Sequence, residues 1–217
     1  MRFAVILSGC GVRDGSEIHE SVFALLAIEQ GGHSVSIFAP DKPQSAVING
    51  VSGRPMNESR NILVESARIA RGAIKPLSEL DVMKFDAIVL PGGFGAACNL
   101  CDFAQKGAGC DVDGDVKSIL IKAQQAGKAL GFMCIAPVIA ARVFGHLGVR
   151  LTIGDDPSTA KACEAMGAKH VVCRVDEVCL DETLRIATTP AYMLAHSMSE
   201  CYASARALVH GIEQLLS

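Results

Sequence analysis

One cysteine stands at a place in this chain where a reactive group is easy to position. The segment 130–137 reads LGFMCIAP, so that Cys134 follows an apolar strand and Pro137 begins a helix. Proline suits a first helical turn because the N–H that it lacks has no partner there. This is the layout of a nucleophile elbow in which Cys replaces the Ser of the G-x-S-x-G pattern. Because a helix N-terminus favours a thiolate, we predict that Cys134 is a nucleophile with a lowered pKa.

The loop after the first apolar strand supplies candidate acid/base groups. Asp14 and Glu17 have the spacing of a capping box, which gives Glu17 a structural role. Glu20 lies one turn further, among apolar residues, where a carboxylate costs desolvation energy unless it has a partner. A thiol sharing a proton with Glu20 would make it the acid/base, although the spacing alone leaves Glu17 as an alternative. Cys10, in the same loop, is a candidate accessory residue.

A second glycine-rich turn, PGGFG at 91–95, follows another apolar strand. Two successive glycines let backbone N–H groups turn toward a neighbouring site. We expect Gly92 and Gly93, together with the N–H of Ile135, to bind an oxyanion. Taken alone, the segment is also compatible with an ordinary turn between a strand and a helix.

Two rival interpretations concern ligands. Gly9-x-Gly11-x-x-x-Gly15 resembles a dinucleotide-binding fingerprint, but its spacing is one residue too long and no acidic residue follows at the required strand end. Cys98 and Cys101 have a spacing seen in metal sites, yet no second pair accompanies them. We therefore expect neither a metal nor a cofactor, and we keep nucleotide binding as a minor alternative.

Short apolar runs alternate with helical stretches along the chain, which predicts a single α/β domain over 1–217 with a mostly parallel sheet covered on both faces. Ligands of such sheets bind at the carboxyl ends of the strands, so the informative loops are 8–16, 91–99 and 134–137. Residues 44–58 are polar and rich in Gly and Pro, which suggests a small hairpin or lid. The expected strands are 3–7, 34–39, 87–90, 129–133, 149–153, 170–173, 178–180 and 184–187, and the expected helices are 16–30, 59–71, 113–126, 137–144, 157–166 and 191–217.

Composition excludes several classes of protein. Of 217 residues, 50% are hydrophobic and 20% are charged, which excludes disorder. The net charge is −3, no Lys/Arg run occurs, and only 5% of the residues are aromatic. The sequence therefore gives no indication of nucleic-acid binding. No segment is long and apolar enough for a membrane span or a signal peptide. Nine cysteines, an odd number, then indicate reduced thiols and a cytoplasmic location.

The helix expected at 16–30 is apolar on nearly every side. Its apolar residues include Val22, Phe23, Leu25, Leu26 and Ile28. Such a helix is buried on more than one side. One side faces the sheet, and the other is covered either by the C-terminal helix or by a second subunit.

Several motifs together resemble the ThiJ/PfpI superfamily, whose fold is that of class I glutamine-amidotransferase domains. The resemblance is closer to its enhancing-lycopene-biosynthesis branch, whose name refers to isoprenoid biosynthesis. It implies a flavodoxin-like three-layer sandwich, a homodimer, and glyoxalase activity without a cofactor, with Cys134 as nucleophile and Glu20 as its carboxylate partner. The motifs are LSGCGVRDGSEIHE (7–20), APDKPQ (39–44), ESRNILVESARIARG (58–72), PGGFGAACNL (91–100), GFMCIAP (131–137), LTIG (151–154) and TTPAYM (188–193).

Two departures from the superfamily restrict the reaction. Its peptidase-like members have His after the nucleophile, where this chain has Ile135, and neither His196 nor His210 is followed by Glu at the spacing of amidotransferases. The sequence thus favours a lyase that converts small 2-oxoaldehydes, such as glyoxal and methylglyoxal, to 2-hydroxy acids. The alternative is a non-enzymatic redox-sensing or partner-binding protein, in which Cys134 is the reactive thiol and Cys10 the resolving one.

Overall fold

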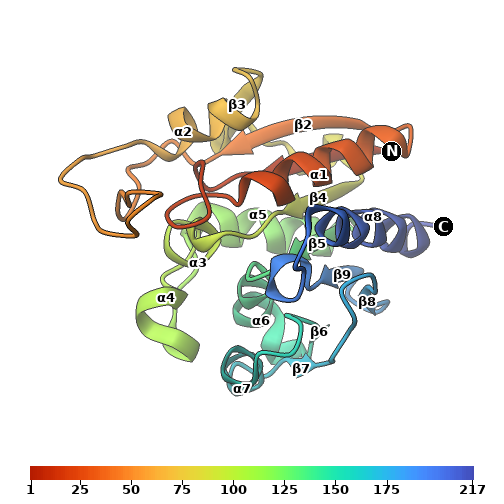
Figure 1. The fold of residues 1–217 in the computed structure, drawn as a ribbon. Coiled ribbons are helices and arrows are strands. Elements are labelled where there is room, and N and C mark those ends of the chain that lie inside the picture. Colours follow the sequence, from red (N-terminus) through yellow and green to blue (C-terminus); the bar gives the residue numbers. More distant parts are fainter.

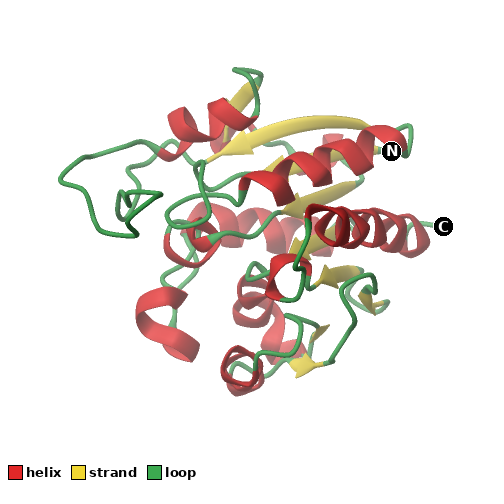
Figure 2. Cartoon of the chain, in the orientation of Figure 1, coloured by secondary structure: helices red, strands yellow, loops and turns green.

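A seven-stranded sheet forms the centre of the computed structural model, which describes residues 1–217 (Figures 1 and 2). Six strands run parallel, and the edge strand β8 is antiparallel to β9. A separate parallel pair, β6 (Arg150–Leu151) and β7 (Lys169–His170), lies outside this sheet. In spatial order the central strands are β3 (Ile74–Pro76), β2 (Ser34–Ala39), β1 (Arg2–Ile6), β4 (Ala87–Leu90), β5 (Ala129–Met133), β9 (Ile186–Thr189) and β8 (Cys179–Asp181).

The three central strands β1, β4 and β5 are buried on both faces, as their continuous apolar sequences predict. Successive side chains point to opposite layers. In β1, Phe3 and Val5 contribute to one core, while Ala4 and Ile6 contribute to the other. The register pairs Phe3 with Ala87 and continues across β4 to β5, so the ends of these strands lie side by side.

Helices cover both faces of the sheet, which confirms the predicted three-layer, flavodoxin-like sandwich with a mostly parallel sheet (Figure 2). On the face of Phe3 lie α1 (Ile18–Gln30), α2 (Ile62–Ile69) and α8 (Met198–Leu215). On the opposite face lie α5 (Gly114–Gln125), α6 (Pro137–Phe144) and α7 (Pro157–Ala165), while the short α3 (Phe94–Cys98) and α4 (Phe103–Lys106) follow β4. None of the helices combines the length and the hydropathy needed to cross a membrane.

Two predicted helices begin later than expected, because the residues that cap their N-termini lie further along the chain than the sequence pattern indicated. The first helix begins at Ile18, since the carboxylate of Glu17 accepts the N–H of Glu20 at 2.7 Å and caps it. Asp14 instead accepts the N–H of Ile48 at 2.7 Å, so the predicted capping box is wrong. The helix predicted from 59 begins at Ile62, after Asn61 as the cap.

Other boundaries also differ from prediction. The last helix begins at Met198, because residues 190–197 form a separate turn in which Ala191 has a left-handed backbone with φ of 43°. The strand expected at 149–153 is only the two residues of β6, and the one expected at 170–173 ends at His170. Strand β3 and helices α3 and α4 were not predicted. These elements are five residues or shorter, so they carry little periodic signal.

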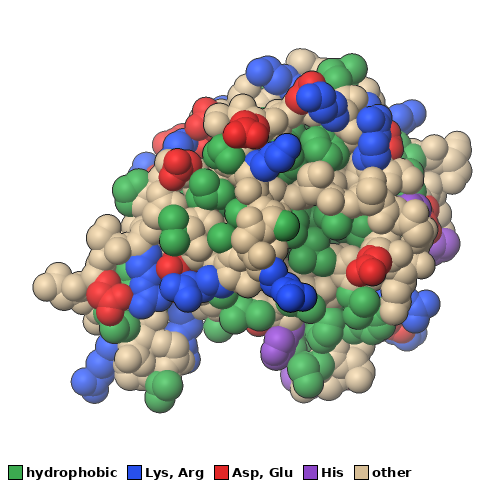
Figure 3. Space-filling view, turned by 90° about the horizontal axis from the view of Figure 1, so that it is seen from above, with side chains coloured by type: hydrophobic (Ala, Val, Ile, Leu, Met, Phe, Trp, Pro, Cys, Tyr) green, Lys and Arg blue, Asp and Glu red, His purple; other side chains and the backbone are tan.

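Helix α1 packs against both the sheet and α8, so the C-terminal helix supplies the predicted cover. The rings of Phe23 and Tyr202 from the two helices lie 5.5 Å apart. A third face of α1 stays open, with Ile18, Val22 and Leu26 exposed at 44%, 43% and 37%. In the view from above, hydrophobic side chains are open to solvent between charged ones (Figure 3).

Candidate active site

Cys134 lies at the sharp bend between β5 and α6. Its backbone is left-handed, with φ of 58°, a conformation that residues other than glycine seldom adopt. Its N–H donates to the carbonyl of Thr189 at 3.0 Å, which ties the bend to the end of β9. Helix α6 begins three residues later, at Pro137. The backbone thus has the form of a nucleophile elbow, with strain concentrated at the residue that carries the thiol.

The carboxyl group of Glu20 meets this thiol. Glu20 is fully buried, and the Cys134 thiol donates a hydrogen bond to it. Its Oε2 also accepts the N–H of Gly92 at 2.9 Å, and its Oε1 accepts the N–H of Tyr192 at 3.2 Å. Burial raises the pKa of Glu20 to about 7, and the charge of Glu17 adds to this, although the three hydrogen bonds act in the opposite direction. Glu20 can therefore gain or lose a proton near neutral pH.

Cys134 is only 8% exposed, and its thiol is not the acidic one that the sequence predicted. Burial, followed by the negative charge of Glu20 and the hydrogen bond to it, raises the pKa of Cys134 well above its ordinary value. The N–H groups of Gly93 and Ile135, which both donate to the sulfur, only partly offset this. The predicted lowering at the helix N-terminus is therefore wrong for this pair. At neutral pH the pair shares at least one proton.

Gly92 allows these two side chains to meet. A Cβ at this position would lie 2.5 Å from the Cβ of Cys134 and 2.6 Å from Oε2 of Glu20. Because real carbon atoms do not approach so closely, any larger residue would push the pair apart. The N–H of Gly92 is already bound by Glu20, so it is not free to hold an oxyanion as we expected. The N–H groups of Gly93 and Ile135 are the two that face the sulfur.

Glycines also join the loop 8–16 to the turn after β4. A Cβ on Gly95 would lie 2.5 Å from the Cα of Gly15, and one on Gly93 would lie 2.3 Å from the backbone nitrogen of Glu17. The glycine spacing thus serves close packing between two loops. Since the carboxylate of Glu17 caps α1, a phosphate would meet a negative charge at this helix N-terminus. The geometry therefore removes the support for nucleotide binding.

Cys10 lies beside α2 rather than in the Cys134 pair. Burial and the charge of Glu65 raise the pKa of Cys10, while Arg68 acts in the opposite direction. The charged group that faces Cys134 is Glu20 instead. The structure thus places Cys10 among a different set of neighbours from the thiol that it was expected to assist.

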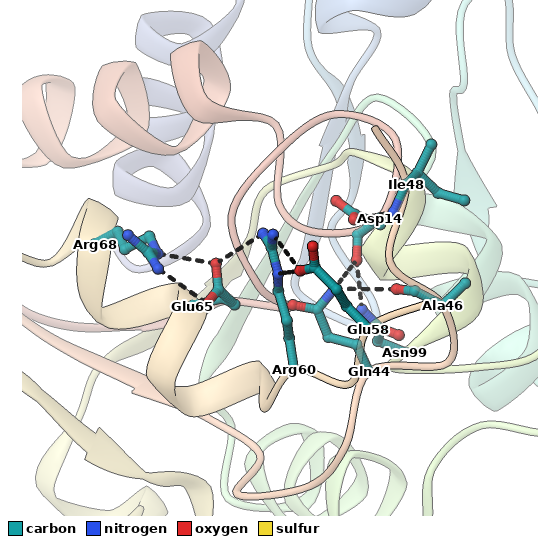
Figure 4. A network of polar contacts seen from close by, with 9 residues as sticks. All are labelled: Asp14, Gln44, Ala46, Ile48, Glu58, Arg60, Glu65, Arg68 and Asn99. Carbon is teal, nitrogen blue, oxygen red and sulfur yellow. Dashed lines mark hydrogen bonds and ion pairs between the residues drawn. The ribbon is translucent and has the colours of Figure 1, made fainter. Parts of the chain in front are cut away.

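Residues 43–61, which we call the strap, form the predicted small hairpin and are tied to the loop 8–16. The hairpin is marked by a bridge between Ile48 and Pro55. Figure 4 shows Asp14 at the junction, where its carboxylate accepts the N–H of Ile48 and its carbonyl accepts side-chain N–H groups of Gln44 and Asn99. The strap is therefore fastened to the loop that leads into Glu20.

The other end of the strap is held by ion pairs. Arg60 lies between two carboxylates, with distances of 2.7 Å to Glu58 and 3.7 Å to Glu65 (Figure 4). Glu65 is 6% exposed and also pairs with Arg68 at 2.9 Å. These ion pairs oppose movement of Arg60 away from Glu65, because the buried carboxylate would then have one guanidinium partner fewer to compensate its charge.

A fourth loop, which was not predicted as part of the site, lies at the same edge of the sheet. Tyr192 follows β9, donates its N–H to Glu20, and has its hydroxyl 2.8 Å from Nδ1 of His19. Burial raises the pKa of the Tyr192 phenol to about 12. Thr189 fixes Cys134 through its carbonyl, while its own hydroxyl is buried without a partner. The position of TTPAYM after an apolar run could have indicated this loop, had the final helix been placed later.

Comparison with known proteins fits this architecture. No protein-family model matches the chain. The chain is 45% identical to the human mitochondrial glutamine amidotransferase-like class 1 domain-containing protein 3, over 99% of its own length and 83% of the human protein. The chain belongs to the glutamine amidotransferase-like class 1 domain family. Similar proteins of rat and zebrafish are also named as mitochondrial, so our expectation of a cytoplasmic location is wrong by this comparison.

Solved structures extend the family relationship. An isoprenoid biosynthesis protein with an amidotransferase-like domain from Ehrlichia chaffeensis is 32% identical, with a TM-score of 0.92 and 99% coverage of both chains. A cysteine-to-alanine mutant of a DJ-1 superfamily protein from Salmonella typhimurium shares the fold, with a TM-score of 0.55, 22% identity and coverage of 98% and 94%. The amidotransferase-like relatives bear out the coarser part of the expected superfamily, and the DJ-1 superfamily protein shows a shared fold.

Proposed function

We propose that the chain is a cofactor-independent glyoxalase that converts small 2-oxoaldehydes, such as glyoxal and methylglyoxal, to 2-hydroxy acids. One observation carries the proposal: a buried thiol and a buried carboxyl group meet across Gly92, and two N–H groups face the sulfur. This arrangement offers a nucleophile, a proton carrier and oxyanion donors within one site.

In the first step, Glu20 takes the thiol proton of Cys134 while the sulfur attacks the aldehyde carbon. A C–S bond forms, the C=O π bond breaks, and the new oxyanion receives a proton to give a hemithioacetal. The N–H groups of Gly93 and Ile135 stabilise the negative charge on this oxygen. A base with a pKa of about 7 suits the step, because it is ionised in part at neutral pH and returns protons readily.

In the second step, Glu20 moves a proton between the two carbon atoms. It removes the hydrogen from the carbon that bears sulfur, which gives an enediol, and returns a proton to the neighbouring carbon, which gives a thioester. Water then cleaves the C–S bond and releases the 2-hydroxy acid and the Cys134 thiol. The overall reaction adds one water to the substrate, and oxidation of one carbon balances reduction of the other.

Burial of the site favours small substrates. Cys134 is 8% exposed and lies against Gly92, so little of the residue is open to a carbonyl compound. Two- and three-carbon aldehydes meet this condition better than a peptide chain. The side chain after the nucleophile, Ile135, cannot act as a base, which leaves Glu20 as the proton carrier in contact with the thiol.

The test compares turnover of glyoxal and methylglyoxal by the wild type and by Cys134→Ser and Glu20→Gln. We expect Cys134→Ser to fall to background, and Glu20→Gln to lose roughly 10²–10⁴-fold in kcat/KM, the usual contribution of a general acid/base. Cys98→Ser is the matched control, because Cys98 lies on α3 outside the pair, and it should retain the wild-type rate. Wild-type turnover in Cys134→Ser, or no turnover in the wild type, would refute the proposal.

We also propose that the protein is a homodimer. The open face of α1, formed by Ile18, Val22 and Leu26, is an apolar stripe at four-residue spacing that a second copy can cover. This stripe runs along the helix that carries Glu20, so subunit contact would steady the site. Light scattering of the wild type and of Val22→Asp tests the dimer.

A further inference from the structure

Two cysteine thiols meet at the edge of the sheet, away from the Cys134 site. Cys179 begins the edge strand β8, and Cys173 precedes the turn that leads to this strand. The turn is closed by the N–H of Glu177, which donates to the carbonyl of Arg174 at 3.1 Å, and by the N–H of Arg174, which donates to Oε2 of Glu177 at 2.8 Å. The chain therefore reverses between the two cysteines, and their thiols interact closely enough to shift each other's pKa.

This pair is unlike the other cysteines. All nine cysteines are free, and the sulfur atoms of Cys98, Cys101 and Cys110 bond to oxygen atoms or to a methionine sulfur, not to another thiol. The interaction with Cys179 lowers the pKa of Cys173 to about 7, assisted by Thr152 and opposed by burial. The pKa of each of the other eight cysteines is raised, Cys134 included. Cys173 is thus the cysteine whose pKa is lowered, and a lowered pKa favours the reactive thiolate.

A small oxidant can approach Cys173. The residue lines an open cleft of about 820 Å³ between the end of α1, the outer face of α8 and the turn after Cys173. Val178 and Arg206 lie on the walls of the same cleft. Cys173 is 7% exposed and Cys179 is 4% exposed, so both are largely buried, but only Cys173 is among the residues that line the cleft.

We propose that Cys173 and Cys179 form a reversible disulfide when the protein meets a peroxide. The Cys173 thiolate attacks one peroxide oxygen, so that an S–O bond forms, the O–O bond breaks, and water leaves after protonation. Cys179 then attacks the sulfenic sulfur, so that an S–S bond forms, the S–O bond breaks, and a second water leaves. Two thiols lose two electrons in total, and hydrogen peroxide is reduced to two waters.

The disulfide would close a ring over 173–179 at the sheet edge and fix one wall of the cleft. Cys179 pairs with Thr188 across β8 and β9, and the next residue of β9, Thr189, holds the N–H of Cys134. A short backbone path therefore joins the thiol pair to the elbow. The proposal stands independently of the glyoxalase reaction, since neither cysteine belongs to the Cys134 site.

A tryptic cleavage site lies between the two cysteines, so a disulfide between them can be detected directly by mass spectrometry. Trypsin cleaves after Lys169, Arg174 and Arg185, so that Cys173 and Cys179 fall on different peptides, 170–174 and 175–185. The folded wild-type protein is treated with a few equivalents of hydrogen peroxide, its remaining thiols are blocked with N-ethylmaleimide, and the digest is measured by mass spectrometry. We expect the two peptides mainly as one linked species, which dithiothreitol separates, while Cys163 remains blocked by the maleimide.

Variants separate the two steps. In Cys179→Ala the linked species should vanish, and dimedone should instead trap a sulfenic acid on Cys173. Cys98→Ala, changed outside the pair, should still give the linked species. Recovery of both wild-type peptides as separate maleimide adducts, with peroxide consumed at Cys134 or not at all, would overturn the proposal. Because the decisive measurement uses the unaltered chain, a variant that fails to fold does not affect it.

Discussion

Replacing Glu20 by Gln should remove a pH dependence that this buried carboxyl group gives to the stability of the fold. In the folded protein burial raises the pKa of Glu20 from an ordinary 4.5 to about 7. A raised pKa means that the folded chain holds the proton more tightly than the unfolded chain does. The resulting stabilisation is complete below pH 4.5 and is lost as the pH rises toward 7.

The size of the effect follows from these two values. At about 1.4 kcal/mol for each pH unit, the free energy of unfolding should fall by on the order of 3 kcal/mol across this interval. The hydrogen bonds from Gly92 and Tyr192 are already included in this figure, because they favour the ionised carboxylate and keep the pKa below the value that burial alone would give. Urea denaturation of the wild type and Glu20→Gln, followed by circular dichroism at several pH values from 4 to 8, measures the difference.

The Glu20→Gln variant retains every other titrating group, so the difference between the two proteins isolates the contribution of Glu20. Gln keeps the shape of Glu but offers one acceptor oxygen, so at low pH Glu20→Gln should be less stable than the wild type by roughly 1–3 kcal/mol. Residue 20 no longer titrates in this variant. The wild-type advantage should then shrink as the pH rises. A difference between the two proteins that stays constant to within about 0.5 kcal/mol from pH 4 to pH 8 would refute the reasoning.

Three further outcomes follow from the geometry. Gly92→Ala places a Cβ 2.5 Å from that of Cys134 and should lower both turnover and the free energy of unfolding, the latter by roughly 1–3 kcal/mol; unchanged kinetics would contradict the packing. Tyr192→Phe removes the 2.8 Å contact with His19 but keeps the N–H to Glu20, so kcat/KM should change only severalfold; a loss as large as in Glu20→Gln would give the phenol a chemical role. Val22→Asp should convert a dimer to a monomer in light scattering, and a monomeric wild type at micromolar concentration would contradict the homodimer.

The sequence could place Cys134 and the loop that leads to Glu20 at one edge of a parallel sheet, because both follow apolar strands, but the spacing left Glu17 as an alternative to Glu20. It could not foresee the protonation of the pair. The helix N-terminus next to Cys134 predicts an acidic thiol, whereas burial and the charge of Glu20 produce the opposite. Burial depends on the whole packed structure, so a local motif does not report it.

Most hydrogen-bond partners that were predicted wrongly or not at all lie in segments far apart in the sequence. Asp14 has the right spacing to cap with Glu17, yet it binds Ile48 of the strap, 34 residues away. Tyr192 reaches Glu20 across 172 residues. Residues that match a local pattern thus bind partners from elsewhere in the chain. The continuous apolar strands were predicted correctly, because a strand that is buried on both faces of a sheet has an uninterrupted run of apolar residues.

The closely packed glycines Gly15, Gly93 and Gly95 make one side of the site much less tolerant of substitution than the other. Where backbone lies directly on backbone, a new side chain has nowhere to go, and displacement of one loop would drag the other with it. Redesign for larger aldehydes should therefore leave these loops untouched. Substitutions belong instead at the side chain of Tyr192, whose hydroxyl contacts His19 and not the backbone of another loop.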